Sequence, residues 1–101
     1  MKLRLHLLVS KEAERQIRTA AKWWNENRPA ARGLLRQELT QAFQLVTTQP
    51  GIGTRAFDAS IQGVRRIYLF RVRYNLYYRE MNQAVEVLAL WHASRGEGPP
   101  I

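Results

Sequence analysis

Arginine and aromatic side chains are concentrated in the last third of the sequence, between Val64 and Arg95. An arginine guanidinium can bind a phosphate or a carboxylate through two parallel hydrogen bonds and stays charged at physiological pH. His92 is the side chain in this stretch whose charge changes near neutral pH. Such groups could bind an anionic partner or stabilise the charge of a phosphoryl transition state. The candidate contact residues are Arg65, Arg66, Arg71, Arg73, Tyr77, Arg79, His92 and Arg95, with Trp23 added from the first half of the chain.

The overall charge points to an anionic partner. The chain carries 16 lysines and arginines against 8 acidic residues, for a net charge of +8. A surface of this kind attracts nucleic acid, an acidic protein, or each in turn. The alternative is a generally basic protein with no specific partner, because net charge alone speaks only to nonspecific binding.

Several chemistries are excluded or disfavoured by composition. The chain has no cysteine, so disulfides, thiolate metal sites and cysteine nucleophiles are ruled out. The two histidines, His6 and His92, are too far apart in sequence to suggest a metal site, and we expect neither metal nor cofactor. No apolar run approaches the roughly 20 residues that a membrane-spanning helix needs. Residues 1–7 alternate in polarity like a strand instead of forming a signal peptide, so we expect a cytoplasmic protein.

The elements before the arginine-rich region follow from hydrophobic spacing. Residues 3–9 alternate, with leucines and Val9 on one side, which predicts a strand with one buried face. Ser10 is a typical helix N-cap, and an apolar stripe continues to Trp24. Pro29 suits the first turn of a second helix, which Pro50 and its neighbours end. The short break between the two helices predicts an antiparallel helical hairpin.

The rest of the chain predicts a sheet beside that hairpin. Residues 51–62 are expected to be an irregular connection, and residues 64–92 three strands with breaks at 71–73 and 81–83. The predicted fold class is α+β, in the order β-α-α-β-β-β, with a small, mainly antiparallel sheet. The strand at 85–91 should be central, with the first strand at the edge or beside it. The hairpin can cover one face only, so we expect the other, arginine-lined face to be open. Residues 1–95 form one domain, and 96–101 a loose tail.

Alternation along the strands assigns the candidate side chains to faces. Arg65 and Arg66 are adjacent, so they point to opposite faces, one towards a partner and the other towards the hairpin or a loop. Tyr74 and Tyr78 share one face, and Tyr77 lies on the other.

Some candidates also have an ordinary structural explanation. Trp24 fits the apolar stripe of the first helix, which leaves Trp23 at its edge, either as a boundary residue or as a partner-binding anchor. Arg79 next to Glu80 is consistent with a cross-strand ion pair. His92 could be a structural or rim residue.

Two motifs stand out in the last three strands, after the β-α-α opening. They are the strand ending Tyr77-Tyr78-Arg79 and the close Val87-Leu88-Ala89-Leu90-x-His92-x-x-Arg95. Together they resemble the motifs of the RelE/ParE toxin superfamily. The resemblance covers nearly the whole chain and is nearer to the ParE-like, plasmid stabilisation branch. The resemblance implies a toxin of a type II toxin–antitoxin system, neutralised by an acidic, ParD-like or similar antitoxin whose disordered segment wraps it.

The resemblance leaves two targets open. ParE-like members poison DNA gyrase, whereas RelE-like members cut mRNA on the ribosome. RNA cleavage would require a group that activates the 2′-hydroxyl and cations around the phosphate. The RelE pattern also has lysines before the last strands and a late tyrosine, but this chain has no lysine after Lys22 and no tyrosine after Tyr78. Gyrase inhibition is therefore favoured, and a non-toxic relic that only binds its partner is a third possibility. The residues for cleavage would be Arg65, Arg66, Arg79, His92 and Arg95.

Overall fold

A five-stranded sheet forms the centre of the molecule. The computed structural model describes residues 4–101, and the strand order is β1-β5-β4-β3-β2. β1 runs parallel to β5, and the other neighbours are antiparallel. The first strand therefore lies both at an edge and beside β5, and the predicted α+β fold is confirmed. The strands are β1 (His6–Val9), β2 (Thr54–Arg55), β3 (Val64–Leu69), β4 (Tyr74–Met81) and β5 (Ala84–His92).

The start of the chain and the connection before β3 differ from the sequence-based expectation. Of the strand predicted over residues 3–9, only His6–Val9 is a strand, and Leu3 lies outside the described residues. The connection is not wholly irregular, because Thr54 and Arg55 pair with Arg66 and Arg65 of β3. This two-residue strand is too short to produce a recognisable alternation in the sequence.

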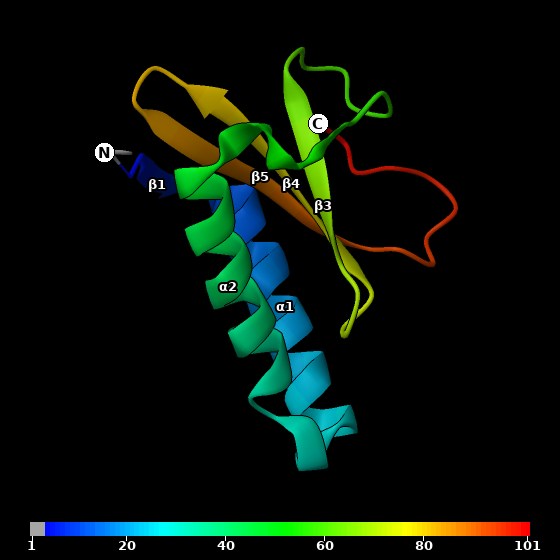
Figure 1. Cartoon of the computed structure of the whole chain (residues 1–101). Helices are drawn as coiled ribbons and strands as arrows, with labels where there is room; N and C mark the ends of the chain where they lie inside the picture. The colour runs from blue at the N-terminus through cyan, green and yellow to red at the C-terminus, as the bar shows by residue number, and fades with distance from the viewer. Residues whose placement is uncertain (1–3) are drawn as a thin grey trace.

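Two helices cover one face of the sheet (Figure 1). α1 (Lys11–Asn27) begins as predicted at Ser10, whose hydroxyl oxygen accepts a 3.0 Å hydrogen bond from the amide of Ala13. The prediction that Pro29 begins the second helix is wrong. Pro29 opens a separate 3₁₀ turn, and α2 (Leu34–Thr48) begins only after it. The indole nitrogen of Trp24 donates to the carbonyl of Ala31 at 2.7 Å, which holds this extra turn against the end of α1.

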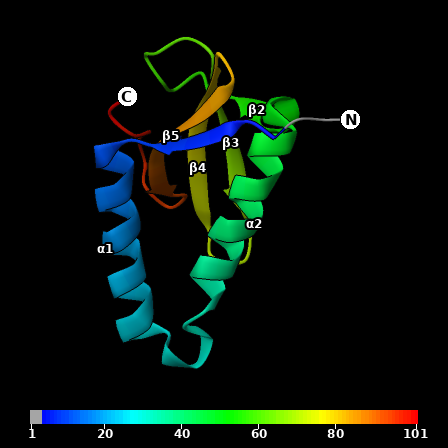
Figure 2. The same ribbon diagram turned by 90° about the vertical axis from the view of Figure 1, so that its left-hand side faces the viewer.

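The helical hairpin and the sheet enclose the main core. Figure 2 shows α1 and α2 side by side, joined at the end that extends beyond the sheet. Between them and the strands lies an apolar cluster with members from both helices, β3, β4, β5 and the β3–β4 turn. Trp24 belongs to this cluster, whereas Trp23 is 45% exposed, as the apolar stripe predicted. The buried members are Ala13, Ala20, Trp24, Leu35, Leu39, Ala42, Leu69, Val72, Leu76, Val87 and Leu90.

A β-bulge in β5 determines which residue at the C-terminal end of this strand faces the helices. Tyr77 pairs with Ala89 but Tyr78 pairs with Val87, so Leu88 is an extra residue without a partner on β4. Val87 and Leu90, three positions apart, consequently both pack in the helix-side core. Strict alternation from Val87 would have turned residue 91 towards the helices; the bulge turns His92 there instead.

The face of the sheet away from the helices, called the outer face below, is not open. A second buried cluster on it contains Val64, Tyr77 and Leu88 but no helix residue. The segment before β3 and the end of the chain cover it: Ile101 packs against the cluster, and its carbonyl accepts hydrogen bonds from the amide and hydroxyl of Ser60 at 2.6 and 2.8 Å. In Figure 1 the red C-terminal segment returns to the green segment before β3. The prediction of an uncovered arginine face is therefore wrong, because residues 96–101, expected to be a loose tail, lie against it.

Candidate functional site

Arg65 and Arg66 point to opposite faces of β3, as expected. The guanidinium of Arg65 donates a 2.7 Å hydrogen bond to the carbonyl of Gly53 and so fastens the segment before β3. Arg66 lies on the outer face, 3.6 Å from a carboxylate oxygen of Asp58 and 3.5 Å from the hydroxyl of Tyr77. The hydrogen bond with Tyr77 raises the pKa of Arg66, so this arginine stays charged. Both arginines already have partners within the fold.

Tyr77 is part of the outer-face core. Its side chain is only 1% exposed, and its hydroxyl donates a 2.8 Å hydrogen bond to Asp58. Burial raises the pKa of the Tyr77 phenol above its ordinary value. The sequence placed Tyr77 among the contact residues, but a buried ring cannot contact a partner without rearrangement. Tyr74 and Tyr78 share one face of the sheet, as predicted, and the structure shows that this is the helix side.

Arg79 makes an ion pair across the sheet with Glu86, and not with its chain neighbour Glu80. Two guanidinium nitrogens of Arg79 lie 3.0 and 2.9 Å from one carboxylate oxygen of Glu86, its partner in the β4–β5 register. Glu86 precedes His92 by six positions on β5, so Arg79 lies roughly 20 Å from His92 at about 3.3 Å per residue. These two nuclease candidates are not brought into one site.

A groove between α1 and the end of β5 does bring several candidates together. We call it the β5 groove; its volume is about 510 Å³. Trp23, Tyr74, His92 and Arg95 line it, together with Trp91, which the sequence did not single out. The rings of Tyr74 and His92 meet edge to face at 5.0 Å, and the Arg95 guanidinium stacks over the Trp91 ring at 4.0 Å. Burial raises the pKa of the Tyr74 phenol, and the nearby charge of Arg95 partly offsets that shift.

The hydrogen bonds of His92 define what its ring can do. The amide of Ser94 donates to Nδ1 of His92 at 3.1 Å, so Nδ1 holds the lone pair of the neutral ring and Nε2 carries the proton. The Ser94 hydroxyl is also 2.7 Å from Nδ1. With its lone pair engaged by this turn, His92 is suited to donate a hydrogen bond to an anion. It is poorly placed to act as a general base.

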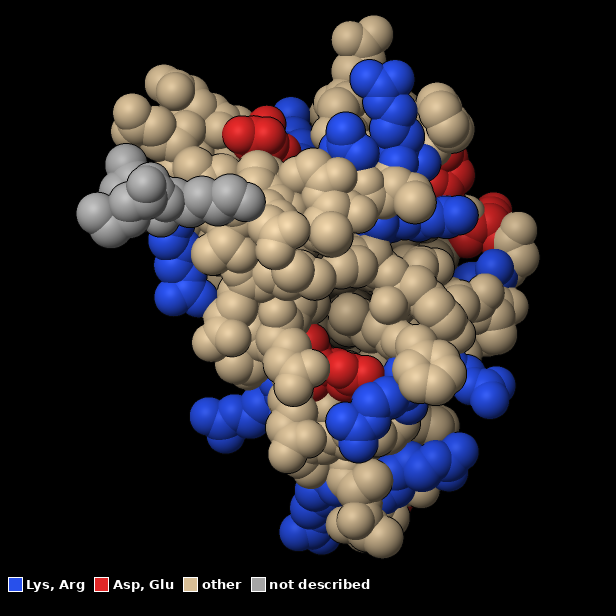
Figure 3. Space-filling view, in the orientation of Figure 1, with Lys and Arg blue, Asp and Glu red and all other residues tan. Residues whose placement is uncertain are grey.

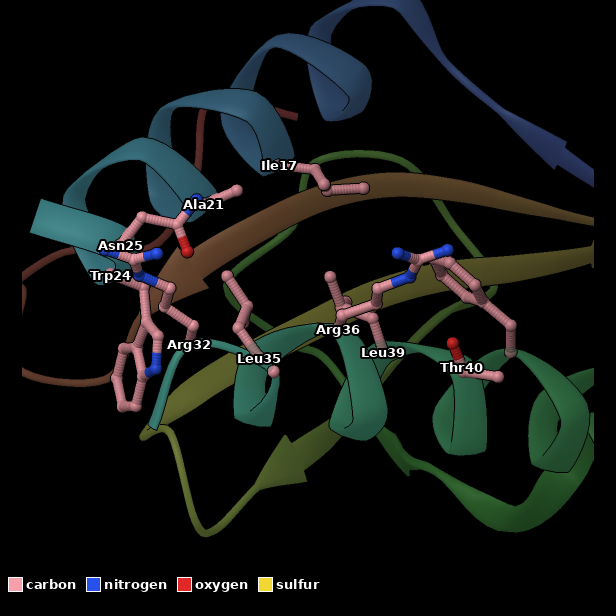
Figure 4. A pocket seen from close by; sticks show the side chains of 11 residues that line it. Ile17, Ala21, Trp24, Asn25, Arg32, Leu35, Arg36, Leu39 and Thr40 are labelled. Atoms are coloured by element: carbon pink, nitrogen blue, oxygen red, sulfur yellow. The ribbon is translucent and has the colours of Figure 1, made fainter. Parts of the chain in front are cut away.

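A second groove lies between the two helices, at the closed end of the hairpin. We call it the hairpin groove; its volume is about 440 Å³. Figure 4 shows Ile17 and Ala21 of α1 facing Leu35 and Leu39 of α2 across it. The side chains of Arg32, Arg36 and Asn25 also line the groove, so an apolar floor carries a basic, polar rim. The sequence presented these apolar residues only as core stripes, because spacing cannot show where two helices diverge.

Two further findings concern residues 4–101. No three His, Asp or Glu side chains in this range are grouped so that they could hold a metal ion. No helix in it is both long and apolar enough to cross a membrane.

Comparison with solved structures defines the class of fold. The fold is similar to that in "Chromosomal ParDE TA system from P. aeruginosa", with a TM-score of 0.73 and 13% identity, covering 90% of this chain and 98% of that chain. It is also similar to "The structure of YoeB dimer from Staphylococcus aureus", with a TM-score of 0.60 and 13% identity, covering 89% of this chain and 98% of that one. The architecture is that of the RelE/ParE superfamily.

The sequence itself then identifies the family. The profile of the family described as "ParE toxin of type II toxin-antitoxin system, parDE" matches residues 7–96. The chain belongs to this family and is a ParE-type toxin of a toxin–antitoxin system. A sequence search of curated proteins finds no significant match.

Proposed function

We propose that this toxin inhibits DNA gyrase and is neutralised by direct binding of a cognate, acidic antitoxin. The observation that carries the proposal is the dispersal of the groups that RNA cleavage would need. Arg66 and Arg79 are engaged with Asp58 and Glu86, and Arg79 is remote from His92. A protein whose candidate catalytic groups are dispersed in this way is best explained as one that acts by binding. A gyrase target also places the toxin in the cytoplasm.

The hairpin groove is the place we assign to the antitoxin. Its floor of Leu35, Leu39 and Ile17 suits apolar side chains, and the guanidinium groups of Arg32 and Arg36 suit carboxylates beside them. An antitoxin segment that is disordered when free could order along this surface on binding, and its acidic residues would speed the encounter. The complex would be a hetero-oligomer in which the groove is covered.

A ribosome-dependent endonuclease is the second candidate. It is favoured by the meeting of His92 and Arg95 in the β5 groove, where an Nε2 proton and a guanidinium could bind a phosphate. Under this alternative, His92→Ala would abolish cleavage of ribosome-bound mRNA while the fold persists. A non-toxic relative that only binds its partner is the third candidate.

The experiment that separates the three candidates uses the purified toxin and its expression without antitoxin. Gyrase inhibition predicts loss of supercoiling activity and accumulation of cleaved plasmid, with ribosome-bound mRNA left intact. Position-specific cuts in that mRNA together with normal gyrase activity would favour the endonuclease. Unchanged viable counts after expression of the free toxin would support the relic.

A further inference from the structure

The turn between β3 and β4 presents side chains that the fold does not use. Phe70 is 75% exposed, and Tyr68, just before it, is 50% exposed. Arg71 and Arg73 are exposed as well, and within residues 4–101 no carboxylate lies within 4.0 Å of either guanidinium. These four residues, Tyr68, Phe70, Arg71 and Arg73, are called the tip cluster below.

The backbone under the tip cluster is held firmly. Val72, within the turn, is 2% exposed and belongs to the helix-side core. The amides of Val72 and Arg73 donate to the carbonyl of Leu69 at 3.1 and 2.7 Å, and the carbonyl of Arg73 accepts from Ala93 at 2.9 Å. The exposed aromatic ring is therefore displayed by an anchored turn and is not the consequence of a loose loop.

Arg73 occupies a backbone conformation that ordinarily favours glycine or asparagine. Its φ angle is 64°, in the left-handed region, where a side chain with a Cβ atom is strained. An asparagine at this position would tolerate the conformation and would remove the charge. Position 73 therefore allows the charge to be tested without distorting the turn.

A recess of about 300 Å³ lies beside the tip cluster, between α2 and β3. Tyr68, Phe70 and Arg71 line it from the strand side, and Glu38 and Gln41 from α2. The Glu38 carboxylate accepts a 3.2 Å hydrogen bond from the amide of Arg71, which ties the turn to the helix. In Figure 3 a red acidic group lies in the middle of this face, with blue basic side chains below it and tan residues above it.

We propose that the tip cluster binds single-stranded nucleic acid. Exposed aromatic rings stack on unpaired bases, and arginines beside them contact the backbone phosphates, which is the common chemistry of single-strand binding. The recess offers room for a base next to Phe70 and Tyr68, and Glu38 and Gln41 provide polar groups at its wall. A duplex keeps its bases stacked and cannot fill the recess. An acidic protein segment would satisfy the arginines, but it would bring carboxylates towards Glu38.

This site is independent of the target chosen under the proposed function, and its test needs neither gyrase nor ribosomes. Fluorescence anisotropy of the full chain with labelled 12-nucleotide oligo-dT and oligo-U measures affinity over a series of salt concentrations. Phe70→Ala should weaken binding by about 5- to 150-fold, the effect of losing one stacked base. Arg71→Gln with Arg73→Asn should reduce the slope of log K against log salt by about 1.4, because each phosphate contact contributes about 0.7 on single strands.

The matched control removes two positive charges elsewhere. Arg18→Gln with Lys22→Gln changes the net charge equally, on the exposed surface of α1, and should alter affinity less than twofold. If the tip variants weaken binding as expected, tighter binding of oligo-dT identifies single-stranded DNA as the ligand. Tighter binding of oligo-U identifies single-stranded RNA. The proposal is overturned if the control weakens binding as much as the tip variants, if a 12-base-pair duplex competes equally well, or if polyglutamate binds with the same dependence on Phe70.

Discussion

The hydroxyl oxygen of Tyr78 accepts a 2.9 Å hydrogen bond from the backbone amide of Gly53, and the same hydroxyl donates to the carbonyl of Pro50 at 2.7 Å. Tyr78 is fully buried, so this one phenol satisfies two backbone groups of the segment that leads from α2 to β3. A β-carbon at position 53 would lie 2.7 Å from both the Arg66 carbonyl oxygen and the Tyr78 hydroxyl. The contact therefore requires glycine because of space, and not because of backbone conformation.

This contact predicts two destabilising substitutions. Tyr78→Phe should lower the free energy of unfolding by about 1–3 kcal/mol, because two buried backbone groups lose their partner. Gly53→Ala should be at least as harmful, since the backbone of β3 would have to move. Urea denaturation measures both. Gly51→Ala is the control, because a β-carbon there meets nothing within 4 Å; an equal loss from this variant would contradict the account.

The buried phenols predict a loss of stability at alkaline pH. Burial raises the pKa values of Tyr77 and Tyr78 above the ordinary value of 10.0. A pKa that is higher in the folded state means that the neutral form is favoured by folding. Its contribution is complete below about pH 10 and is lost as the pH rises through the folded-state pKa values. Urea midpoints measured from pH 8 to pH 11 should fall in the upper part of that range.

Tyr77→Phe should flatten this alkaline fall, because the variant has one fewer buried phenol to ionise. Its stability at pH 8 should be somewhat lower than that of the parent, since the hydrogen bond to Asp58 is gone. A variant with an unchanged slope between pH 10 and pH 11 would show that Tyr77 does not contribute to the effect.

The close approach of Gly98 to Asp58 predicts that adding one methyl group at position 98 will loosen the C-terminal segment. A β-carbon at Gly98 would lie 2.5 Å from a carboxylate oxygen of Asp58. Gly98→Ala should therefore displace the segment and speed hydrogen exchange at the Ser60 amide, which donates to Ile101. At Gly96 a β-carbon meets nothing within 4 Å, so Gly96→Ala should leave this exchange rate unchanged. Identical rates in the parent and in Gly98→Ala would mean that the segment is not held by this contact.

The basic rim of the hairpin groove predicts how antitoxin binding responds to charge. Arg36→Glu should weaken the complex with an acidic antitoxin by tenfold or more, chiefly through repulsion and slower association at low salt. Isothermal titration or surface binding with the cognate antitoxin measures the effect. Arg18→Glu, on the exposed surface of α1, makes the same charge change outside the groove and should have a small effect. Equal losses from both substitutions would argue against the groove as the antitoxin site.

Much of the fold could be predicted from spacing, whereas the face of β5 on which His92 lies could not. The alternation of residues 64–92 and the N-cap at Ser10 are local signals. The three strands β3, β4 and β5 and the start of α1 form where these signals indicated. The bulge at Leu88 left no such signal, because the surrounding run is almost continuously apolar. Its effect is to turn His92 towards Tyr74 and Trp23, a placement that alternation alone would have assigned differently.

The chemistry of the arginines was the least predictable part. Arg66 and Arg79 looked available for a target because sequence shows a charge but not the carboxylate opposite it. Their partners, Asp58 and Glu86, come from a connection expected to be irregular and from the neighbouring strand. Tertiary pairing thus gives Arg66 and Arg79 a role in stability. Among residues 4–101, Arg71, Arg73 and Arg95 remain as the predicted arginines that are exposed and have no carboxylate within ion-pair distance.

The proposed inhibition of gyrase by binding can be tested with a supercoiling assay. Purified toxin is added to gyrase, relaxed plasmid and ATP, and both supercoiled and linear products are measured. A parallel reaction contains toxin preincubated with its antitoxin. We predict inhibited supercoiling and accumulated linear plasmid with the toxin alone, and normal supercoiling when the antitoxin is present. Full supercoiling at a molar excess of free toxin, with no linear product, would show that the toxin does not inhibit gyrase.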